Sequence, residues 1–145
     1  MTLTVFTDGG SLNNPGPAAA AYLIYAPVNR LLEKKAVFLG QTTNNVAEYT
    51  ALQLALTRLR ELKNGRALNG VKKILCYADS LLLVNQLNGL YKIKSARLRE
   101  FVFAIRVLES EVAVPTIYAH ILREKNYEAD ALVKSLLRPL GSEPA

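Results

Sequence analysis

Two aspartates in this sequence each follow a hydrophobic segment and precede small residues. Asp8 comes after the β-branched segment 2–7, and Asp79 comes after the apolar segment 71–77. Ligands of α/β proteins bind where strand ends and the loops after them converge. Carboxylate oxygens are also the ligands that divalent cations such as Mg²⁺ prefer. The two aspartates are therefore the first candidates for metal-assisted chemistry.

Two further carboxylates stand where the sequence does not need them for folding. Glu48 lies one turn into an otherwise apolar helix face, and Asp130 lies one turn into the last predicted helix. Metal-assisted cleavage of a phosphodiester uses oxygen ligands from separate elements, because two ions roughly 4 Å apart hold the attacking water and the leaving oxygen. Taken singly, each carboxylate also has a structural explanation. Asp8 fits a turn residue and Asp79 fits a helix cap. Glu48 could pair with the helix dipole, and Asp130 could be a solvated helix residue.

The hydrophobic pattern predicts the element order βββαβααβα. Apolar, β-rich segments predict strands at residues 2–7, 18–26, 31–39, 71–77 and 115–122. Apolar residues spaced three and four apart predict helices at residues 46–63, 80–87, 95–110 and about 126–137. Asp8-Gly9-Gly10 is expected to end the first strand, and Asn44 or Asn45 to cap the first helix. The first three strands indicate an antiparallel meander, and the fourth fits a central parallel strand.

The composition indicates one compact domain. The chain has 145 residues, of which 50% are apolar, and this is enough for a continuous core. We expect a single domain at residues 1–138 and a flexible tail at 139–145. No uncharged apolar run is long enough to span a bilayer and no signal peptide is evident, so we expect a cytoplasmic protein with no membrane partner. Cys76, the single cysteine, is expected to be buried and unreactive.

The net charge of +6 is compatible with a polyanionic partner and equally with solubility alone. The net charge becomes evidence for a polyanionic partner only if the four carboxylates share one cleft. A negative pocket within a positive surface then suits metal ions together with phosphates.

Four motifs occur along the chain in a fixed order: Asp8-Gly9-Gly10-Ser11 with Asn14-Pro15-Gly16-Pro17, Thr42-Thr43-Asn44-Asn45-Val46-Ala47-Glu48, Asp79-Ser80, and Arg123-Glu124-Lys125-Asn126 leading to Ala129-Asp130. Together they resemble type 1 ribonuclease H (ribonuclease HI), over essentially the whole chain. The resemblance implies an α/β fold, with a five-stranded mixed sheet of order 3-2-1-4-5 and helices on both faces. It also implies hydrolysis of the RNA strand of RNA–DNA hybrids, giving 5′-phosphate and 3′-hydroxyl ends.

The resemblance further assigns roles to individual residues. It implies that Asp8, Glu48, Asp79 and Asp130 bind Mg²⁺ or Mn²⁺, with two ions per site when substrate is bound. Short amides and hydroxyls can donate to and accept from a 2′-hydroxyl. On this basis the residues that resemble the family's substrate contacts are Ser11, Asn13, Asn14, Thr43, Asn44, Asn45 and Gln86, with Thr43 matching a DNA-phosphate contact. Without the resemblance, the same asparagines are explained as turn and cap residues.

The loop before the last carboxylate departs from the pattern of many bacterial members. Those members carry a histidine in this loop, whereas this chain has Arg123-Glu124-Lys125. Arg123 is the candidate to contact phosphate or product instead, as in archaeal-like members, and a solvated loop charge is the alternative. His120, the only histidine, lies in a predicted strand, and we expect it to be structural.

The segment after Gly89 is too short for the basic handle of some members. A basic stretch beside Tyr91 could follow the DNA backbone instead, or could simply be a solvated helix face; it consists of Lys92, Lys94, Arg97 and Arg99.

Three functions compete on the sequence alone. The leading one is a monomeric endonuclease that acts on RNA–DNA hybrids. The second is a catalytically silent module that binds hybrids or double-stranded RNA, against which the four carboxylates argue. The third is a nuclease part of a reverse transcriptase-like polyprotein, or an integrase-like or resolvase-like member of the wider fold. Met1 stands directly before the first strand, so we expect an independent protein.

Overall fold

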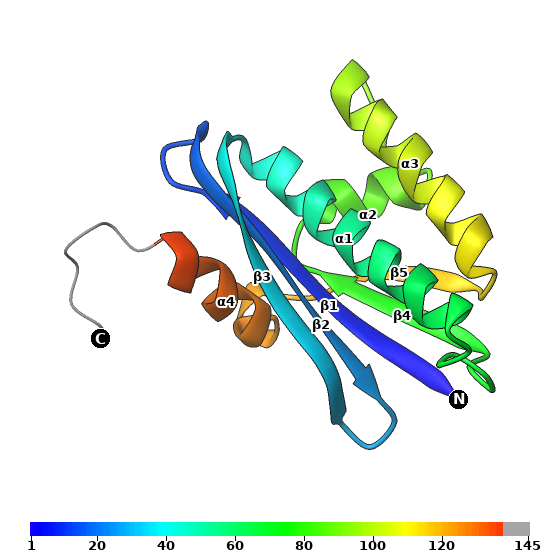
Figure 1. Cartoon of the computed structure of the whole chain (residues 1–145). Coiled ribbons are helices and arrows are strands. Elements are labelled where there is room, and N and C mark those ends of the chain that lie inside the picture. Colours follow the sequence, from blue (N-terminus) through cyan, green and yellow to red (C-terminus); the bar gives the residue numbers. More distant parts are fainter. Residues whose placement is uncertain (138–145) are drawn as a thin grey trace.

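The computed structural model describes residues 1–137 and shows a five-stranded sheet with helices on both faces (Figure 1). The predicted order βββαβααβα is confirmed, with one short 3₁₀ turn added before the last helix. The predicted tail, 139–145, lies outside the described residues. The elements are β1 (Thr2–Ser11), β2 (Gly16–Ala26), β3 (Arg30–Thr42), α1 (Asn44–Asn64), β4 (Lys73–Ala78), α2 (Leu81–Leu87), α3 (Ala96–Val112), β5 (Thr116–His120), η1 (Arg123–Lys125) and α4 (Tyr127–Leu137).

The strands lie in the order β3-β2-β1-β4-β5, as the resemblance implies. β1 is antiparallel to β2 and parallel to β4, while β2 and β3 are antiparallel and β4 and β5 are parallel. β1 is therefore the central strand, at the junction of an antiparallel and a parallel half. Such a junction leaves a strand end with a neighbour on one side only.

The prediction that Asp8-Gly9-Gly10 ends the first strand is wrong. β1 continues to Ser11, because its antiparallel neighbour β2 pairs with it as far as the register Ser11 with Ala18. The parallel pairing with β4 stops earlier, at Thr7 with Ala78. Asp8 therefore stands where β1 loses its neighbour on the β4 side, and Asp79 is the first residue after β4.

The main core lies between the sheet and the helices α1, α2 and α3. Leu52 and Leu56 of α1 and Ile74 of β4 are essentially fully buried there, and each such side chain contributes about 1.5–3 kcal/mol to folding. Cys76 is buried in this core, as predicted. α4 packs on the opposite face of the sheet through a small apolar cluster. None of the helices within residues 1–137 has the length and apolar character needed to cross a membrane.

The first turn of α1 is capped by Thr43, so the prediction of Asn44 or Asn45 as its cap is wrong. Thr43 has extended backbone angles, and its side-chain oxygen accepts a hydrogen bond from the backbone N–H of Val46 at 3.2 Å. Asn44 is already helical and turns its side chain toward β1 instead. The cap therefore leaves the two asparagines free for other contacts.

Candidate active site

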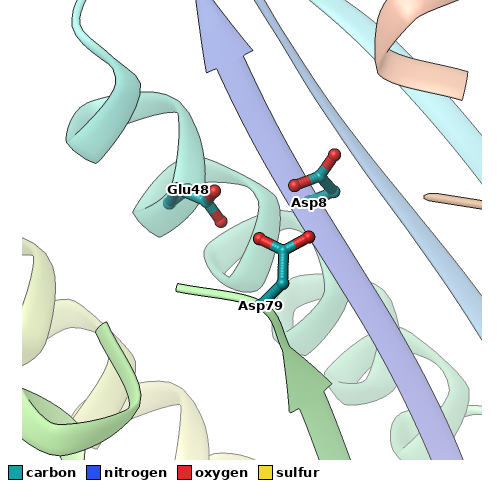
Figure 2. A group of neighbouring side chains, drawn as sticks. All are labelled: Asp8, Glu48 and Asp79. Carbon is teal, nitrogen blue, oxygen red and sulfur yellow. The ribbon is translucent and has the colours of Figure 1, made fainter. Parts of the chain in front are cut away.

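Three carboxylates from three elements converge at one end of the sheet. Asp8 comes from β1, Glu48 from the second turn of α1, and Asp79 from the residue after β4, and their side chains point toward one another (Figure 2). One carboxylate oxygen of each lies within 4.8 Å of the others. β4 pairs with β1 in the sheet and α1 packs against β1, so the fold brings together residues that are distant in sequence.

Gly9 makes the approach of α1 possible. A Cβ atom at this position would lie 2.3 Å from the backbone carbon of Ala47 and 2.5 Å from the backbone nitrogen of Glu48. No side chain fits at such distances, so the helix backbone crosses directly over a glycine. This contact sets how close Glu48 comes to Asp8, and the Gly9 position is therefore part of the site's construction.

Burial makes two of these carboxylates difficult to ionise without a cation. Only 6% of Asp8 and 8% of Glu48 is exposed, whereas Asp79 is half-buried. Desolvation, with further repulsion from Asp79 and Asp130, raises the pKa of Asp8 from 3.8 to about 7. Desolvation and the neighbouring Asp8 and Asp79 raise the pKa of Glu48 well above 4.5. A cation bound among them would reverse both effects.

The chemistry of the cluster fits a divalent metal ion. Its members are all hard, anionic oxygen ligands, as Mg²⁺ and Mn²⁺ require. The Oε2 atom of Glu48 is buried and has no hydrogen-bond partner among residues 1–137. A buried carboxylate oxygen without a partner is costly, and coordination of a metal ion satisfies it.

Asp130 lies at the same site but outside the three-carboxylate cluster. It lines the same cavity from the first turn of α4, and its charge contributes to the raised pKa of Asp8. Its Oδ2 atom forms an ion pair of 2.9 Å with Lys134, one turn further along the helix. The structure therefore places all four predicted carboxylates at one cavity, with Asp130 paired to a side chain of its own helix.

A cavity of about 860 Å³ opens beside the carboxylates, and side chains from β1, α1, η1 and α4 line it. Three of the predicted substrate residues line it: Ser11, Asn44 and Asn45. Arg123 lines it as well, and its charge lowers the pKa of both buried carboxylates. Lys134 is a second cation at the wall, which sequence reasoning did not single out. Lys134 lies four residues after Asp130 on a predicted helix, and this spacing could have indicated that the two side chains are neighbours.

The asparagine residues form a hydrogen-bonded platform next to the cavity. Asn44 accepts through Oδ1 from the backbone N–H of Ser11 at 2.8 Å and from its hydroxyl at 3.2 Å. Asn14 in turn accepts from the backbone N–H of Asn44 at 2.9 Å. Asn13 is exposed, with a left-handed backbone at φ 53°, and Thr43 is occupied as the helix cap. The loop after β1 and the start of α1 are thus joined into one surface.

Gln86 is buried and is not among the residues that line the cavity. Only 6% of this residue is exposed, and its Oε1 atom accepts a hydrogen bond of 2.7 Å from the hydroxyl of Tyr49. It shares the inward side of α2 with Leu83 and Leu87, so it faces the core and not the cavity. The substrate contact of Gln86 stays a prediction.

His120 is the exposed last residue of β5 and is not among the residues that line the cavity. The predicted basic stretch is exposed too, in the segment before α3 and in its first turn. α3 begins at the end of the molecule where α1 also begins (Figure 1). Because His120 is not among the residues that line the cavity, the loop histidine of the bacterial pattern has no counterpart there.

The fold and site together define a class: α/β domains of the ribonuclease H-like fold, with a carboxylate cluster suited to divalent metal ions at the centre of a mixed sheet. The chain belongs to one family within that class, because the model of the RNase H family matches residues 1–138.

Related proteins agree with this assignment. The chain is 32% identical over 139 residues to the uncharacterized protein YpeP of Bacillus subtilis, covering 93% of this chain and 58% of that protein. It is 31% identical over 132 residues to ribonuclease HI of Halobacterium salinarum, covering 91% of this chain and 62% of that protein. The chain thus spans less than two thirds of the length of these relatives.

Among solved structures, LC11-RNase H1 in complex with an RNA/DNA hybrid superposes with a TM-score of 0.87 at 36% identity. The match covers 97% of this chain and 99% of that one. The resemblance read from the four sequence motifs is therefore confirmed for family and fold.

Proposed function

We propose that this protein hydrolyses the RNA strand of RNA–DNA hybrids at the cavity beside Asp8, Glu48 and Asp79. The observation that carries the proposal is the convergence of these carboxylates, two of them buried, beside a cavity large enough for a polymer backbone. Family membership and the hybrid bound in LC11-RNase H1 support the choice of substrate.

The residues proposed to hold Mg²⁺ or Mn²⁺ are Asp8, Glu48 and Asp79, with Asp130 as a fourth ligand. When bound, two such ions supply a more acidic water nucleophile and neutralise the charge that develops on the leaving 3′ oxygen. Asp8 and Glu48 must lose their protons to take part, and because their pKa values are raised this loss requires a higher pH than an ordinary carboxyl group does. Asp130 is paired with Lys134 through Oδ2, and exchange of this partner for a metal ion would free the ammonium to contact a phosphate.

Recognition of the RNA strand is assigned to the platform of asparagines. The Oδ1 atom of Asn44 is occupied by Ser11, so its amide NH₂ group is the end that remains to donate to a sugar or phosphate oxygen. Asn45 lines the same wall. A 2′-hydroxyl is the group by which a protein distinguishes RNA from DNA at one position. Asn13, Asn14 and Thr43 extend this surface, with Thr43 proposed to meet the DNA strand.

The cations at the cavity wall are proposed to hold the phosphates. Arg123 enters from η1 and Lys134 from α4, on opposite sides of Asp130 along the sequence. A guanidinium offers planar, bidentate contacts to a phosphate, whereas an ammonium acts as a point charge. Arg123 is therefore the proposed partner of the scissile region or of the product.

The test uses purified protein with an end-labelled RNA–DNA hybrid in Mg²⁺ or Mn²⁺. Cleavage should occur within the RNA strand and leave 5′-phosphate and 3′-hydroxyl ends, and neither double-stranded DNA nor single-stranded RNA should be cut. Asp79→Asn should abolish cleavage, while Glu100→Gln, which changes an exposed carboxylate on α3, should not. Tight hybrid binding without cleavage in either metal would instead favour the silent binding module.

A further inference from the structure

Asn126 is buried at the corner between η1 and α4. Only 2% of this residue is exposed. Its side-chain Nδ2 donates a hydrogen bond of 2.9 Å to the backbone carbonyl of Thr7 and one of 3.3 Å to the Oδ2 atom of Asp79. One amide group therefore joins the strand residue before Asp8 to the carboxylate of Asp79.

The chemistry of the two partners fixes the orientation of this amide. A carbonyl oxygen and a carboxylate oxygen can only accept, so the NH₂ group must face them. Both amide hydrogens are thus committed, one to the backbone of β1 and one to the side chain of Asp79. The Oδ1 atom is buried and has no hydrogen-bond partner among residues 1–137. The contribution of the side chain to this structure comes through its NH₂ group.

The backbone of Asn126 also connects the other side of the site. Its N–H donates to the carbonyl of Arg123 at 2.9 Å, and its carbonyl accepts from the N–H of Asp130 at 3.0 Å. The first bond closes the turn that carries Arg123, and the second begins the helix that carries Asp130. The sheet side and the α4 side of the cavity are therefore connected through this one residue.

We propose that Asn126 is a positioning residue that sets the orientation of Asp79 and the approach of α4 to the carboxylate cluster. The inference rests on the proposed metal-dependent function. Asn126 is not among the residues that line the cavity, and its amide donates to Asp79, so its effect on the reaction passes through Asp79. A carboxylate held on one oxygen by a fixed donor loses less freedom when it coordinates a cation.

This role predicts a particular pattern of loss. Removing a hydrogen-bond partner of a metal ligand typically lowers metal affinity or activity about 10- to 100-fold. Asn126→Ala should therefore weaken Mn²⁺ binding by about that factor and lower kcat similarly. The KM for hybrid should change less than about 3-fold, because the asparagine platform is untouched.

The experiment compares Asn126→Ala and Asn126→Leu with Leu132→Ala. Leu132→Ala is the matched control, since Leu132 also packs α4 onto the sheet but contributes no polar group. Asn126→Leu keeps much of the side-chain volume without the donor, so a deficit shared by both Asn126 variants does not come from a packing defect. Mn²⁺ affinity is measured by calorimetry on folded protein without substrate, and kcat and KM are measured on a hybrid.

The two Asn126 variants should lose Mn²⁺ affinity at least about 10-fold relative to Leu132→Ala. In wild-type protein, the side-chain NH₂ resonances of Asn126 should also shift when Mg²⁺ is added, a readout that needs no variant to fold. Equal Mn²⁺ affinity in all three variants, or NH₂ resonances that do not respond to Mg²⁺, would overturn the proposal. If wild-type protein binds neither ion and does not cut hybrid, the proposed function itself has failed.

Discussion

Asp8→Asn should stabilise the metal-free protein at alkaline pH while abolishing its activity. The pKa of Asp8 is raised in the folded state from 3.8 to about 7. Between these values the folded state binds a proton that the unfolded state has already lost, so the stability of the wild type falls as the pH rises. The penalty is absent below pH 3.8 and complete above about pH 7. An amide at this position has no charge to desolvate and avoids the penalty.

The size of the effect follows from the same two values. At 1.36 kcal/mol per pH unit, a pKa raised from 3.8 to about 7 corresponds to a penalty of about 4 kcal/mol at pH 8. At pH 5 the same relation gives a stability penalty of about 2 kcal/mol. Loss of the Asp8 charge also removes one of the repulsions that raise the pKa of Glu48, so ionising Glu48 becomes easier in the variant. The two changes act in the same direction.

The measurement is urea unfolding of both proteins in EDTA at pH 5 and pH 8. Asp8→Asn should be more stable at pH 8, and its advantage should shrink at pH 5. Saturating Mg²⁺ should reduce the advantage again, because only the wild type keeps the full ligand set and gains stability by binding. Glu100→Gln, on an exposed face of α3 and outside the carboxylate cluster, is the control variant. A variant less stable than wild type at pH 8 in EDTA would refute the reasoning.

Three further predictions concern the architecture around the carboxylates. Gly9→Ala should destabilise the fold by about 1–3 kcal/mol or more in urea unfolding and reduce cleavage, because its Cβ would overlap the backbone of α1; unchanged stability would contradict the close crossing. Thr43→Ala should cost about 1 kcal/mol through loss of the α1 cap, with Thr43→Ser restoring most of it in the same assay. Arg123→Gln should weaken hybrid binding and reduce the slope of log K against log salt by about 1 if the guanidinium contacts a phosphate; an unchanged slope would remove that role.

The placement of Asp8 and Asp79 could be predicted because it depends on local pattern. Each follows an apolar run, and strands of an α/β sheet bring such positions to one edge. The length of β1 could not be predicted, because its last residues are held by pairing with β2 and that register is a tertiary feature. The glycines that look like a strand terminator in sequence are, in the fold, the place where a helix crosses a strand.

Gln86 and Asn126 show what the sequence does not reveal about the surroundings of a polar residue. Both are amides near a predicted carboxylate, and both are buried. Gln86 lies on the buried side of α2, which has only about two turns. In so short a helix the spacing of apolar residues does not show which side faces the core, so the burial of Gln86 was not evident. Asn126 stands beside a motif and resembles an ordinary turn residue. Only the three-dimensional path of η1 brings its amide to Asp79.

The features that weaken this fold are the same features that suit it to bind a cation. Gly9 permits a helix–strand crossing close enough to bring Glu48 beside Asp8. Burial is the main cause of the raised pKa of both carboxylates, and repulsion from Asp79 adds to it. A metal-free protein keeps a proton or an unsatisfied charge there, and Glu48 has a buried oxygen without a hydrogen-bond partner among residues 1–137. Because a divalent ion would bind the folded arrangement and not the unfolded chain, the instability of the metal-free cluster and its proposed affinity for metal are two consequences of one geometry. Substitutions that relieve the first should therefore weaken the second.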